Sequence, residues 1–421
     1  MLDRDLLRTD PERVREAAMS KNEPCPIEEW LGLDAKRRTL VFEIDELRKK
    51  RNELSKAVSS AKKQGRDASE QMDESRRTGE RIALLEKEAS AIDAALAGLD
   101  LRFPNIPDPD VPKGDASANE VVRQVGEKQS FDFEPKPHWE LLRGGLDPEA
   151  AGRIAGSNFI LLRGSAAALQ RRLISWMIDT HTRSGMQEVW APFLARSESM
   201  TTTAQLPKLE ADMYRLENDD LYLVPTGEVP ITNLYREAIL DESDLPVKLC
   251  GYTPCFRREA GSYGRETRGL NRVHQFEKVE MVWLTHPDRS AEAHLEMLAQ
   301  AETLLQKLGL TYRVVLLATG DLSFAAAKCF DIELWAPGQN AWLEVSSVSN
   351  FRDFQARRGM IRYKPSGGGK PRLVHTLNGS GLALPRLIAA LAEQFQAPGI
   401  PDYPSFLLDQ VTQRIGPGQS K

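Results

Sequence analysis

Residues 250–284 read CGYTPCFRREAGSYGRETRGLNRVHQFEKVEMVWL. Two apolar runs, 251–256 and 275–284, flank a charged loop that contains glycines, so we expect a β-hairpin with a long cationic loop. Arg257 and Glu280 fall inside the strand-like runs rather than at the tip of the hairpin. Because buried charges need partners, they favour a polyanionic ligand over a merely solvated surface hairpin. The stretch contributes further cations: Arg258, Arg265, Arg268, Arg272 and Lys278.

Length and composition bound the remaining possibilities. The chain has 421 residues, 41% of them hydrophobic, which suffices for two domains with a sizeable core. The net charge of −5 means that a nucleic-acid partner would have to meet a local basic patch. The N-terminus lacks the apolar core of a signal peptide, and no apolar run approaches the ~18 residues of a membrane span. We therefore expect a cytoplasmic protein without a membrane segment.

The four cysteines form neither a CxxC pair nor a zinc-ligand pattern. Free thiols in a chain of this size suit a reducing cytosol, and we expect no zinc. The cysteines are Cys25, Cys250, Cys255 and Cys329.

The first hundred residues show two apolar seams with helical spacing, separated by a polar break at 64–66. Intervals of three, four and seven residues are typical of helices that pack along a narrow seam. We expect an antiparallel helical hairpin, and at ~1.5 Å per residue roughly 35 residues reach about 50 Å. The seams are Leu33, Leu40, Ile44, Leu47, Leu54, Val58 and Ala61, then Ile82, Leu85, Ala89, Ile92, Leu96 and Leu99.

A basic cluster lies near the tip of this hairpin, with eight Lys or Arg against two Glu between positions 46 and 66. One interpretation is a solvated helix face. The other is contact with phosphates, because the positive excess is concentrated on an otherwise acidic protein. The cations are Arg48, Lys49, Lys50, Arg51, Lys56, Lys62, Lys63 and Arg66.

Four prolines between 104 and 112 interrupt regular structure, and mixed helix and strand patterns follow from about residue 134. We expect a linker over 104–130, a helix over about 169–178 and a last helix over about 385–396. Strand-like runs lie at 189–194, 221–224, 311–319, 330–336, 341–349 and 374–377. The turn at 337–340 is too short for a parallel crossover, so much of the sheet should be antiparallel. Pro371 stands where a P-loop needs Ser or Thr, so 366–371 is a turn rather than a phosphate loop.

Several segments in this order together resemble the seryl-tRNA synthetases, a class II aminoacyl-tRNA synthetase family. FRREAGSYGRETRGLNRVHQFEKVE (256–280) is similar to class II motif 2, GMQEVWAP (185–192) to motif 1 and TLNGSGLALPR (376–386) to motif 3. Thr226-Gly227-Glu228 matches the family's Thr-x-Glu element, and 344–347 its Glu-x-Ser-Ser element. The hairpin at 1–103 is similar to the family's tRNA-binding arm, and 131–421 to its catalytic domain.

The resemblance implies roles for individual residues. Arg257 would stabilise the α-phosphate, where the transition state gathers charge, Glu259 would accept from the adenine amino group, and Arg386 would hold the γ-phosphate. Phe276 would stack on the adenine ring, and Glu344 and Ser347 supply oxygens suited to Mg²⁺. The implied ATP-binding set is Arg257, Arg258, Glu259, Val273, Phe276, Glu344, Val345, Ser346, Ser347 and Arg386. The implied serine-binding set is Thr226, Gly227, Glu228, Glu280 and Ser380. The implied tRNA-binding set is Arg48, Lys49, Lys50, Arg51, Lys62 and Lys63.

Other interpretations exist for some of these positions. Glu344 also fits a cross-strand ion pair, Thr226 and Ser380 also fit turn or capping roles, and His274 is better explained as a hydrogen-bonded structural residue. Three positions depart from the family's usual pattern: Leu343 in place of Arg, Pro385 in place of Gly, and Asn271 in place of an apolar residue. Leu343 puts in doubt a supporting ion pair behind the ATP site.

The expected fold is α+β: a helical-hairpin arm followed by a class II catalytic domain built on an antiparallel sheet flanked by helices. The expected activity is formation of seryl-adenylate from serine and ATP with Mg²⁺, then transfer of serine to the 3′ end of tRNA(Ser) by a homodimer. Charging of tRNA(Sec) stays open. The alternatives are a paralogue that loads a small amino acid onto a carrier protein, which has no use for a basic arm, and a non-catalytic scaffold, which would not retain Arg257, Glu280 and Arg386.

Overall fold

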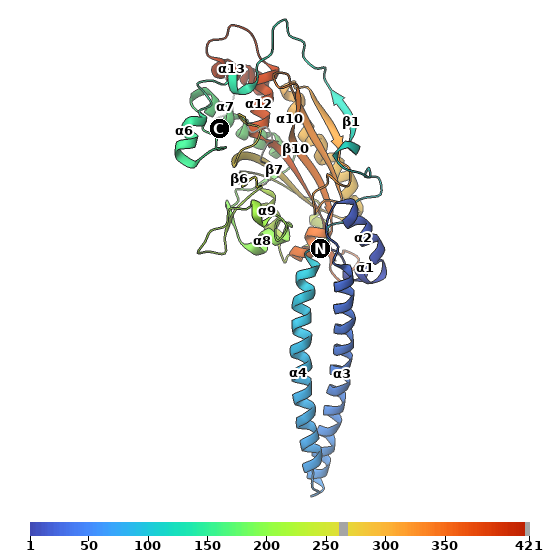
Figure 1. Ribbon diagram of the computed structural model, residues 1–421. Coiled ribbons are helices and arrows are strands. Elements are labelled where there is room, and N and C mark those ends of the chain that lie inside the picture. The colour runs from blue at the N-terminus through green and yellow to red at the C-terminus, as the bar shows by residue number, and fades with distance from the viewer. Residues whose placement is uncertain (261–267, 417–421) are drawn as a thin grey trace. The chain divides into compact units, whose positions relative to one another are not determined.

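The computed structural model describes residues 1–260 and 268–416, so Arg265 of the expected loop lies outside the described residues. The chain divides into two compact units, Met1–Pro104 and Asn105–Lys421. The first is helical and the second combines helices with a large antiparallel sheet, which confirms the expected α+β class (Figure 1).

The first unit consists of two short helices followed by two long ones. The long helices lie side by side and run antiparallel, joined by a short turn after residue 63, which confirms the predicted hairpin (Figure 1). We call this pair the arm. The helices are α1 (Arg4–Thr9), α2 (Pro11–Ser20), α3 (Ile27–Lys63) and α4 (Ser69–Asp100).

The two seams of the arm are buried to different extents. All six predicted seam residues of α4 are buried. On α3 only Leu40 and Ile44 are buried, and the other five are partly exposed. In a two-helix arm each seam side chain is covered from one side only, so partial exposure is expected toward the tip. At the other end Trp30 is fully buried and donates through Nε1 to Asp100 at 2.8 Å.

The second unit is built on an eight-stranded sheet with the order β1-β8-β9-β10-β13-β7-β6-β2. All neighbouring pairs are antiparallel except β2 and β6, which confirms the antiparallel prediction. The strands are β1 (Glu120–Val125), β2 (Gln187–Glu188), β6 (Val247–Phe256), β7 (Gln275–Thr285), β8 (Tyr312–Leu316), β9 (Lys328–Ala336), β10 (Ala341–Arg352) and β13 (His375–Ala383). Smaller sheets contain β3 (Leu194–Ala195), β4 (Tyr222–Leu223), β5 (Ile239–Asp241), β11 (Arg362–Lys364) and β12 (Arg372–Leu373).

Helices of this unit surround the sheet. The longer ones are α7 (Gly164–Arg183), α10 (Ser290–Leu308), α12 (Leu384–Gln394) and α13 (Tyr403–Ile415). The shorter ones are α5 (His138–Leu141), α6 (Pro148–Ala155), α8 (Ser197–Thr202), α9 (Glu228–Thr232) and α11 (Phe354–Gly359).

Three local predictions differ from the structure. The predicted linker 104–130 contains β1, which pairs with β8 at the edge of the main sheet and has mostly exposed side chains. The strand-like run 189–194 is not continuous, because β2 ends before it and β3 begins at its last residue. A helix, α13, follows the one predicted to be the last.

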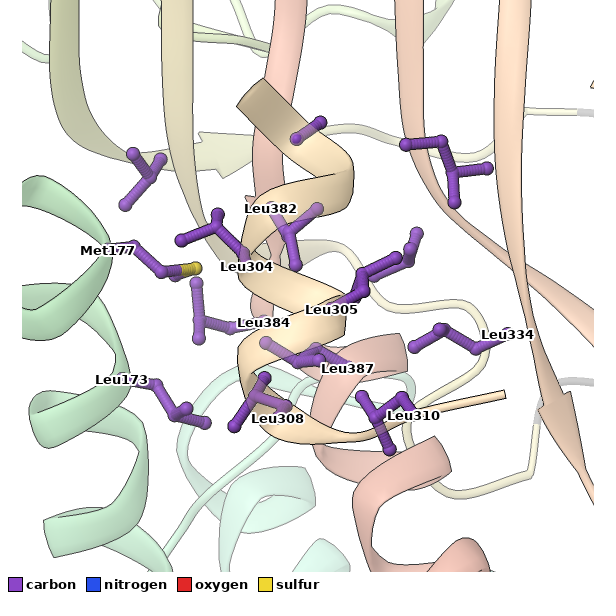
Figure 2. Close-up of a cluster of buried hydrophobic side chains, with 14 of the residues drawn as sticks. Leu173, Met177, Leu304, Leu305, Leu308, Leu310, Leu334, Leu382, Leu384 and Leu387 are labelled. Atoms are coloured by element: carbon purple, nitrogen blue, oxygen red, sulfur yellow. The ribbon is translucent and has the colours of Figure 1, made fainter. Parts of the chain in front are cut away.

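The hydrophobic core lies between one face of the sheet and the four longer helices. Figure 2 shows α10 at its centre, with leucines of α10, α12 and β13 pointing toward one another and toward Leu173 and Met177 of α7. On β7, Val279, Met281 and Trp283 face this core because alternate residues of a strand share a face. The intervening residues of β7 are therefore available to the opposite face.

Removing a central core side chain should destabilise this unit. Leu304 of α10 is fully buried in the cluster of Figure 2, so Leu304→Ala should lower the free energy of unfolding by about 2–5 kcal/mol. Leu295 on the same helix is 57% exposed, and Leu295→Ala should cost less than about 0.5 kcal/mol. Denaturant unfolding followed by tryptophan fluorescence measures both, and equal losses would contradict this assignment of the core.

Candidate active site

A cavity of about 490 Å³ lies over β7, β13 and β10, three strands that are neighbours in the sheet. The sheet order thus gathers segments far apart in the sequence. The predicted site residues that line it are Thr226, Glu228, Arg257, Glu259, Val273, Phe276, Glu344, Val345, Ser347, Ser380 and Arg386. Four predicted residues are not in its lining: Gly227, Arg258, Glu280 and Ser346.

These four residues lie directly behind or beside the lining. Glu280 is fully buried and bonds to Thr226, and Ser346 Oγ donates to the main-chain oxygen of Ser380 at 2.5 Å. A Cβ at Gly227 would lie 3.1 Å from both Glu280 Cβ and Thr253 Oγ1, so only a very small residue fits there. Arg258 is exposed, and its main-chain N–H donates to the Asp212 carbonyl at 2.8 Å.

Arg257 immediately follows β6 and points its guanidinium toward an aromatic ring. Its Cζ lies 5.2 Å from the centre of the Phe276 ring on β7, and its Nε donates to the Pro225 carbonyl at 3.3 Å. Cation and ring thus form one wall, suited to a planar, anionic ligand. His274 bonds to the Arg257 carbonyl through Nδ1 at 2.9 Å, as expected of a structural histidine.

Glu259 has a backbone conformation that side chains rarely adopt, with a φ of 52°. Its carboxylate pairs with Arg272 on the returning side of the loop. Positive φ values at non-glycine residues cost energy and concentrate at functional sites. The ion pair with Arg272 and the positive φ together define the position of the Glu259 carboxylate at the edge of the cavity.

Arg386 lies in the first turn of α12 and is held by main-chain oxygens of two segments. Its Nε donates to the Asn271 carbonyl at 3.1 Å, and its Nη1 donates to the Glu344 carbonyl at 2.9 Å. The same Nη1 lies 3.4 Å from a carboxylate oxygen of Glu344. The guanidinium is 30% exposed, so it remains accessible from the cavity.

A second part of the cavity is built around the buried carboxylate of Glu280. Thr226 Oγ1 donates to one oxygen at 2.7 Å and Asn378 Nδ2 donates to the other at 2.6 Å. Lys278 forms an ion pair with Glu280 and donates to Thr226 Oγ1 at 2.9 Å. The carboxylate is therefore neutralised within the protein, as burial of a charge requires.

Glu228 is the other buried carboxyl group of this region. Gln355 Nε2 donates to it at 2.6 Å, and Thr376 Oγ1 in turn donates to the Gln355 amide oxygen at 2.8 Å. Burial raises the pKa of Glu228 to about 7, against the opposing effect of the Gln355 hydrogen bond. The group thus titrates near neutral pH.

The oxygens of Glu344, Ser347 and Asp331 form a third cluster. Ser347 Oγ donates to Asp331 Oδ1 at 2.7 Å. Burial, reinforced by the charge of Glu344, raises the pKa of Asp331 well above its usual range. Carboxylate and hydroxyl oxygens are hard ligands that suit Mg²⁺, which takes one or two carboxylates and completes its shell with water and phosphate. The described residues contain no group of three or more His, Cys, Asp or Glu arranged to hold a metal.

Sequence reasoning missed several residues that the structure adds to the site. Lys278 was named only as one of the cations of the hairpin and was assigned no place in the site. It lies between Phe276 and Glu280 on the same face of β7, so strand alternation could have placed it there. Asn378 stands two residues before Ser380 on β13 and could have been found in the same way. Gln355 and Asp331 carry no sequence signal, because only tertiary packing brings them to Glu228 and Ser347.

The predicted tRNA-binding cations all lie on α3, exposed, in the arm unit. Three of them pair with acidic residues of the same unit. Arg48 pairs with Glu86 at 2.8 Å, Lys49 with Glu46 at 2.5 Å and Lys50 with Glu74 at 2.7 Å. The remaining predicted cations are Arg51, Lys62 and Lys63.

Comparison with known proteins agrees with this architecture. Residues 1–107 match the family model "Seryl-tRNA synthetase N-terminal domain", and residues 210–395 match "tRNA synthetase class II core domain (G, H, P, S and T)". The serine--tRNA ligase of Thermomicrobium roseum is 51% identical over 423 residues, covering 99% of this chain and 95% of that protein. The chain belongs to the seryl-tRNA synthetase family. The serine--tRNA ligase of Thermotoga neapolitana is 48% identical and spans 94% of this chain and 95% of its own length.

The fold is also that of solved seryl-tRNA synthetases. The crystal structure of the Pyrococcus horikoshii enzyme complexed with ATP aligns with a TM-score of 0.91 at 36% identity, covering 98% of both chains. The activity of the chain is that of a serine–tRNA ligase with ATP as substrate, and the carrier-protein alternative is not supported. No helix within residues 1–260 or 268–416 is long and apolar enough to cross a membrane.

The buried Glu228 carboxyl should make stability depend on pH. Its folded-state pKa of about 7 lies above the ordinary 4.5, so the folded protein binds more protons between these values. The contribution of Glu228 to the free energy of unfolding is therefore fully present below about pH 4.5 and is lost as the pH rises through about 7. Relative to Glu228→Gln, the wild-type protein should lose about 3 kcal/mol across this range. Denaturant unfolding of both proteins from pH 4.5 to 8 measures the difference, and a constant difference would contradict a raised pKa.

Proposed function

We propose that the cavity forms seryl-adenylate from serine and ATP, and that the arm holds the tRNA that receives the serine. One observation carries the first part: a cationic and aromatic wall shares one cavity with Thr226 and the buried carboxyl group of Glu228. The first set suits a nucleoside triphosphate and the second an amino acid's ammonium group. Joining the two requires both ligands side by side.

At the nucleotide end, Arg257 binds the α-phosphate oxygens, where negative charge increases as the carboxylate of serine attacks. Phe276 stacks on the adenine ring, and Glu259 accepts a hydrogen bond from the adenine amino group. Arg386 binds the γ-phosphate and helps the pyrophosphate to leave. Arg258, Val273, Val345 and Ser346 complete the surroundings of the nucleotide.

Mg²⁺ at Glu344 and Ser347 would neutralise phosphate charge when bound. Asp331 supports this site by accepting the Ser347 hydroxyl proton in a hydrogen bond. The proposal includes no zinc, which elemental analysis of the purified protein tests directly.

At the amino-acid end, Glu228 and Thr226 border a polar pocket for the ammonium group, and Ser380 contacts the serine side chain. Glu280 completes the serine-binding set from behind, where it fixes Thr226 by a hydrogen bond. Gly227 leaves room for Glu280 behind the pocket. The carboxylate of serine is already ionised at neutral pH, so the first step needs no general base. Alanine would leave polar groups unpaired and is rejected strongly, whereas threonine is excluded by steric fit.

Loss of Arg257 should slow adenylation selectively. Arg257→Ala removes one charge that acts on the transition state, so serine-dependent ATP–pyrophosphate exchange should fall by about 10²–10³-fold in a folded protein. The matched control is Arg236→Ala, which removes an arginine paired with Glu198 and not found in the cavity lining. A near wild-type exchange rate for Arg257→Ala would reject the assigned role.

For the second step we propose that residues 1–103 form the tRNA-binding arm, 131–421 the catalytic domain, and 104–130 their connection, with β1 serving the catalytic sheet. The arm offers phosphate contacts through its basic cluster, and the partner is tRNA(Ser). Charging of tRNA(Sec) is a further possibility that aminoacylation of that tRNA would test. Cytoplasmic location follows from this role in translation.

The paired and remaining cations of the arm should contribute unequally. Replacing Arg51, Lys62 and Lys63 by Gln should weaken tRNA(Ser) binding about tenfold and lower the slope of log K against log salt by ~2, because fewer counterions are released. Replacing Arg48, Lys49 and Lys50 is the matched comparison, and its effect should be smaller because arm carboxylates already neutralise them. Filter binding at several salt concentrations measures both. Serine activation should not change in either variant, and equal effects on tRNA binding would contradict the distinction.

We also propose a homodimer that uses the face around α7, β2 and β6. A groove of about 660 Å³ on this face includes Trp190, which is 75% exposed, and Tyr252. Large exposed aromatic groups mark protein interfaces. Sedimentation of the wild-type protein and of Trp190→Glu tests this assembly.

A further inference from the structure

A buried hydrogen-bond network lies beside the cavity and involves two residues to which the proposed chemistry assigns no role. His138 of α5 and Glu393 of α12 are both fully buried and absent from the cavity lining. Buried ionisable groups are costly, so their retention calls for a purpose. Their contacts lead to the segment that carries Asn271.

Glu393 accepts hydrogen bonds from five N–H groups. Its Oε1 accepts from the main-chain N–H and Nδ1 of His138, both at 2.9 Å, and from Gln339 Nε2 at 2.7 Å. Its Oε2 accepts from the main-chain N–H groups of Gly338 at 2.9 Å and Gln339 at 3.2 Å. Five donors suit a carboxylate, which only accepts. The group therefore ties α12 to α5 and to the turn between β9 and β10.

His138 continues the network to the returning side of the loop between β6 and β7. Its Nε2 accepts from the main-chain N–H of Leu270 at 2.9 Å, which assigns the ring proton to Nδ1 and makes Nδ1 the donor to Glu393. Gly269 has a φ of 64°, and a Cβ there would lie 2.2 Å from His138 Nε2. The main chain thus approaches the imidazole more closely than any other residue type would allow.

A second branch reaches the same segment through side-chain amides. Asn271 Nδ2 donates to Gln339 Oε1 at 2.6 Å, while Gln339 Nε2 donates to Glu393. The carbonyl of Asn271 accepts from Arg386 Nε at 3.1 Å. Leu270, Asn271, Arg272 and Val273 all line the cavity. Asn271, which departs from the family's usual apolar residue, therefore connects the network to Arg386.

We propose that His138 and Glu393 are positioning residues for ATP. They hold the main chain of 270–273 at two points, and through the Asn271 carbonyl they fix the direction of the Arg386 guanidinium. Neither touches a substrate. The inference rests on the proposed nucleotide role of Arg386. It adds that the buried His138–Glu393 network determines the geometry of the nucleotide end of the site.

Two substitutions of His138 separate its two hydrogen bonds. His138→Asn keeps a donor near Nδ1 for Glu393 but leaves the Leu270 N–H without an acceptor. His138→Gln places an amide oxygen near Nε2 and restores that acceptor. His138→Asn should raise the KM for ATP about tenfold, as for one buried N–H left unpaired, without changing the KM for serine. His138→Gln should recover most of the loss. Pyrophosphate exchange with ATP and serine varied in turn measures both constants.

Asn271→Leu tests the second branch without touching the buried pair, so the proposal stays testable if His138 variants fold poorly. It should also raise the KM for ATP alone. Gln394→Ala is the matched control: Gln394 is the next buried residue of α12, but it bonds to Gln129, Thr311 and Trp335. It should lower the melting temperature without separating the two KM values.

The outcomes distinguish this inference from the proposed function. Equal changes in both KM values, or no rescue by His138→Gln, would overturn the positioning role even if Arg386→Ala abolishes exchange. An unaffected Arg386→Ala would instead refute the nucleotide role on which the inference rests.

Discussion

The alternation of side chains across β6, β7, β13 and β10 is the constraint on which the catalytic unit depends. Each strand supplies apolar residues to the helix-covered face, while the residues of the other face that border the cavity are mostly polar. Farther along that face, Leu249, Val282 and Leu284 pack in smaller apolar clusters. On β7 the alternation separates Val279, Met281 and Trp283 from Phe276, Lys278 and Glu280. A shift of register by one residue would exchange these sets and place two charges in the core. Stability and chemistry are thus secured by the same backbone pairing.

The catalytic unit must also balance the charges of its buried carboxyl groups, because parts of the polar face of the sheet are shielded from water. Glu280 is balanced by Lys278, Thr226 and Asn378, and Glu393 by five N–H donors. Glu228 has only the Gln355 amide as its first partner, which is why burial dominates its pKa. Asp331 is similar, with Glu344 adding repulsion. Glu228 lines the cavity, and Asp331 lies one hydrogen bond behind it through Ser347, so both of these carboxyl groups with a raised pKa lie at or next to the proposed substrate space.

Much of the fold could be predicted from the sequence because its signals are periodic. Apolar residues recur at helical spacing along the α4 seam, and two apolar runs flank the charged loop of the hairpin at 250–284. The order of the sequence motifs indicated the seryl-tRNA synthetase family. Features without such a signal were missed. β1 directly follows the proline-rich segment that indicated a linker, and its mostly exposed side chains show no alternation of buried and exposed residues. α13 was missed because the helix over about 385–396 was predicted to be the last one.

The site shows the same division. Arg257, Glu259, Phe276 and Arg386 stand in motifs and were predicted, and the cavity contains all four, although their roles remain proposals. Lys278 and Asn378 required the strand face to be considered as well. Gln355, Asp331 and His138 required the tertiary structure, because their partners lie more than ten residues away in sequence.

The edge position of β1 has a practical consequence for dissecting this protein. β1 covers the backbone hydrogen-bonding groups of β8, and Arg123 pairs with Glu302 on α10 beside it. Asn105 anchors the preceding segment through bonds to the carbonyls of Ala325 and Phe351, both at 2.8 Å. An armless fragment that begins at residue 131 would leave the outer edge of β8 without its partner strand, although β8 would still pair with β9, and exposed strand edges recruit strands from other molecules. Such a fragment would be prone to aggregate. A fragment that begins before Asn105 retains β1, which covers the outer edge of β8.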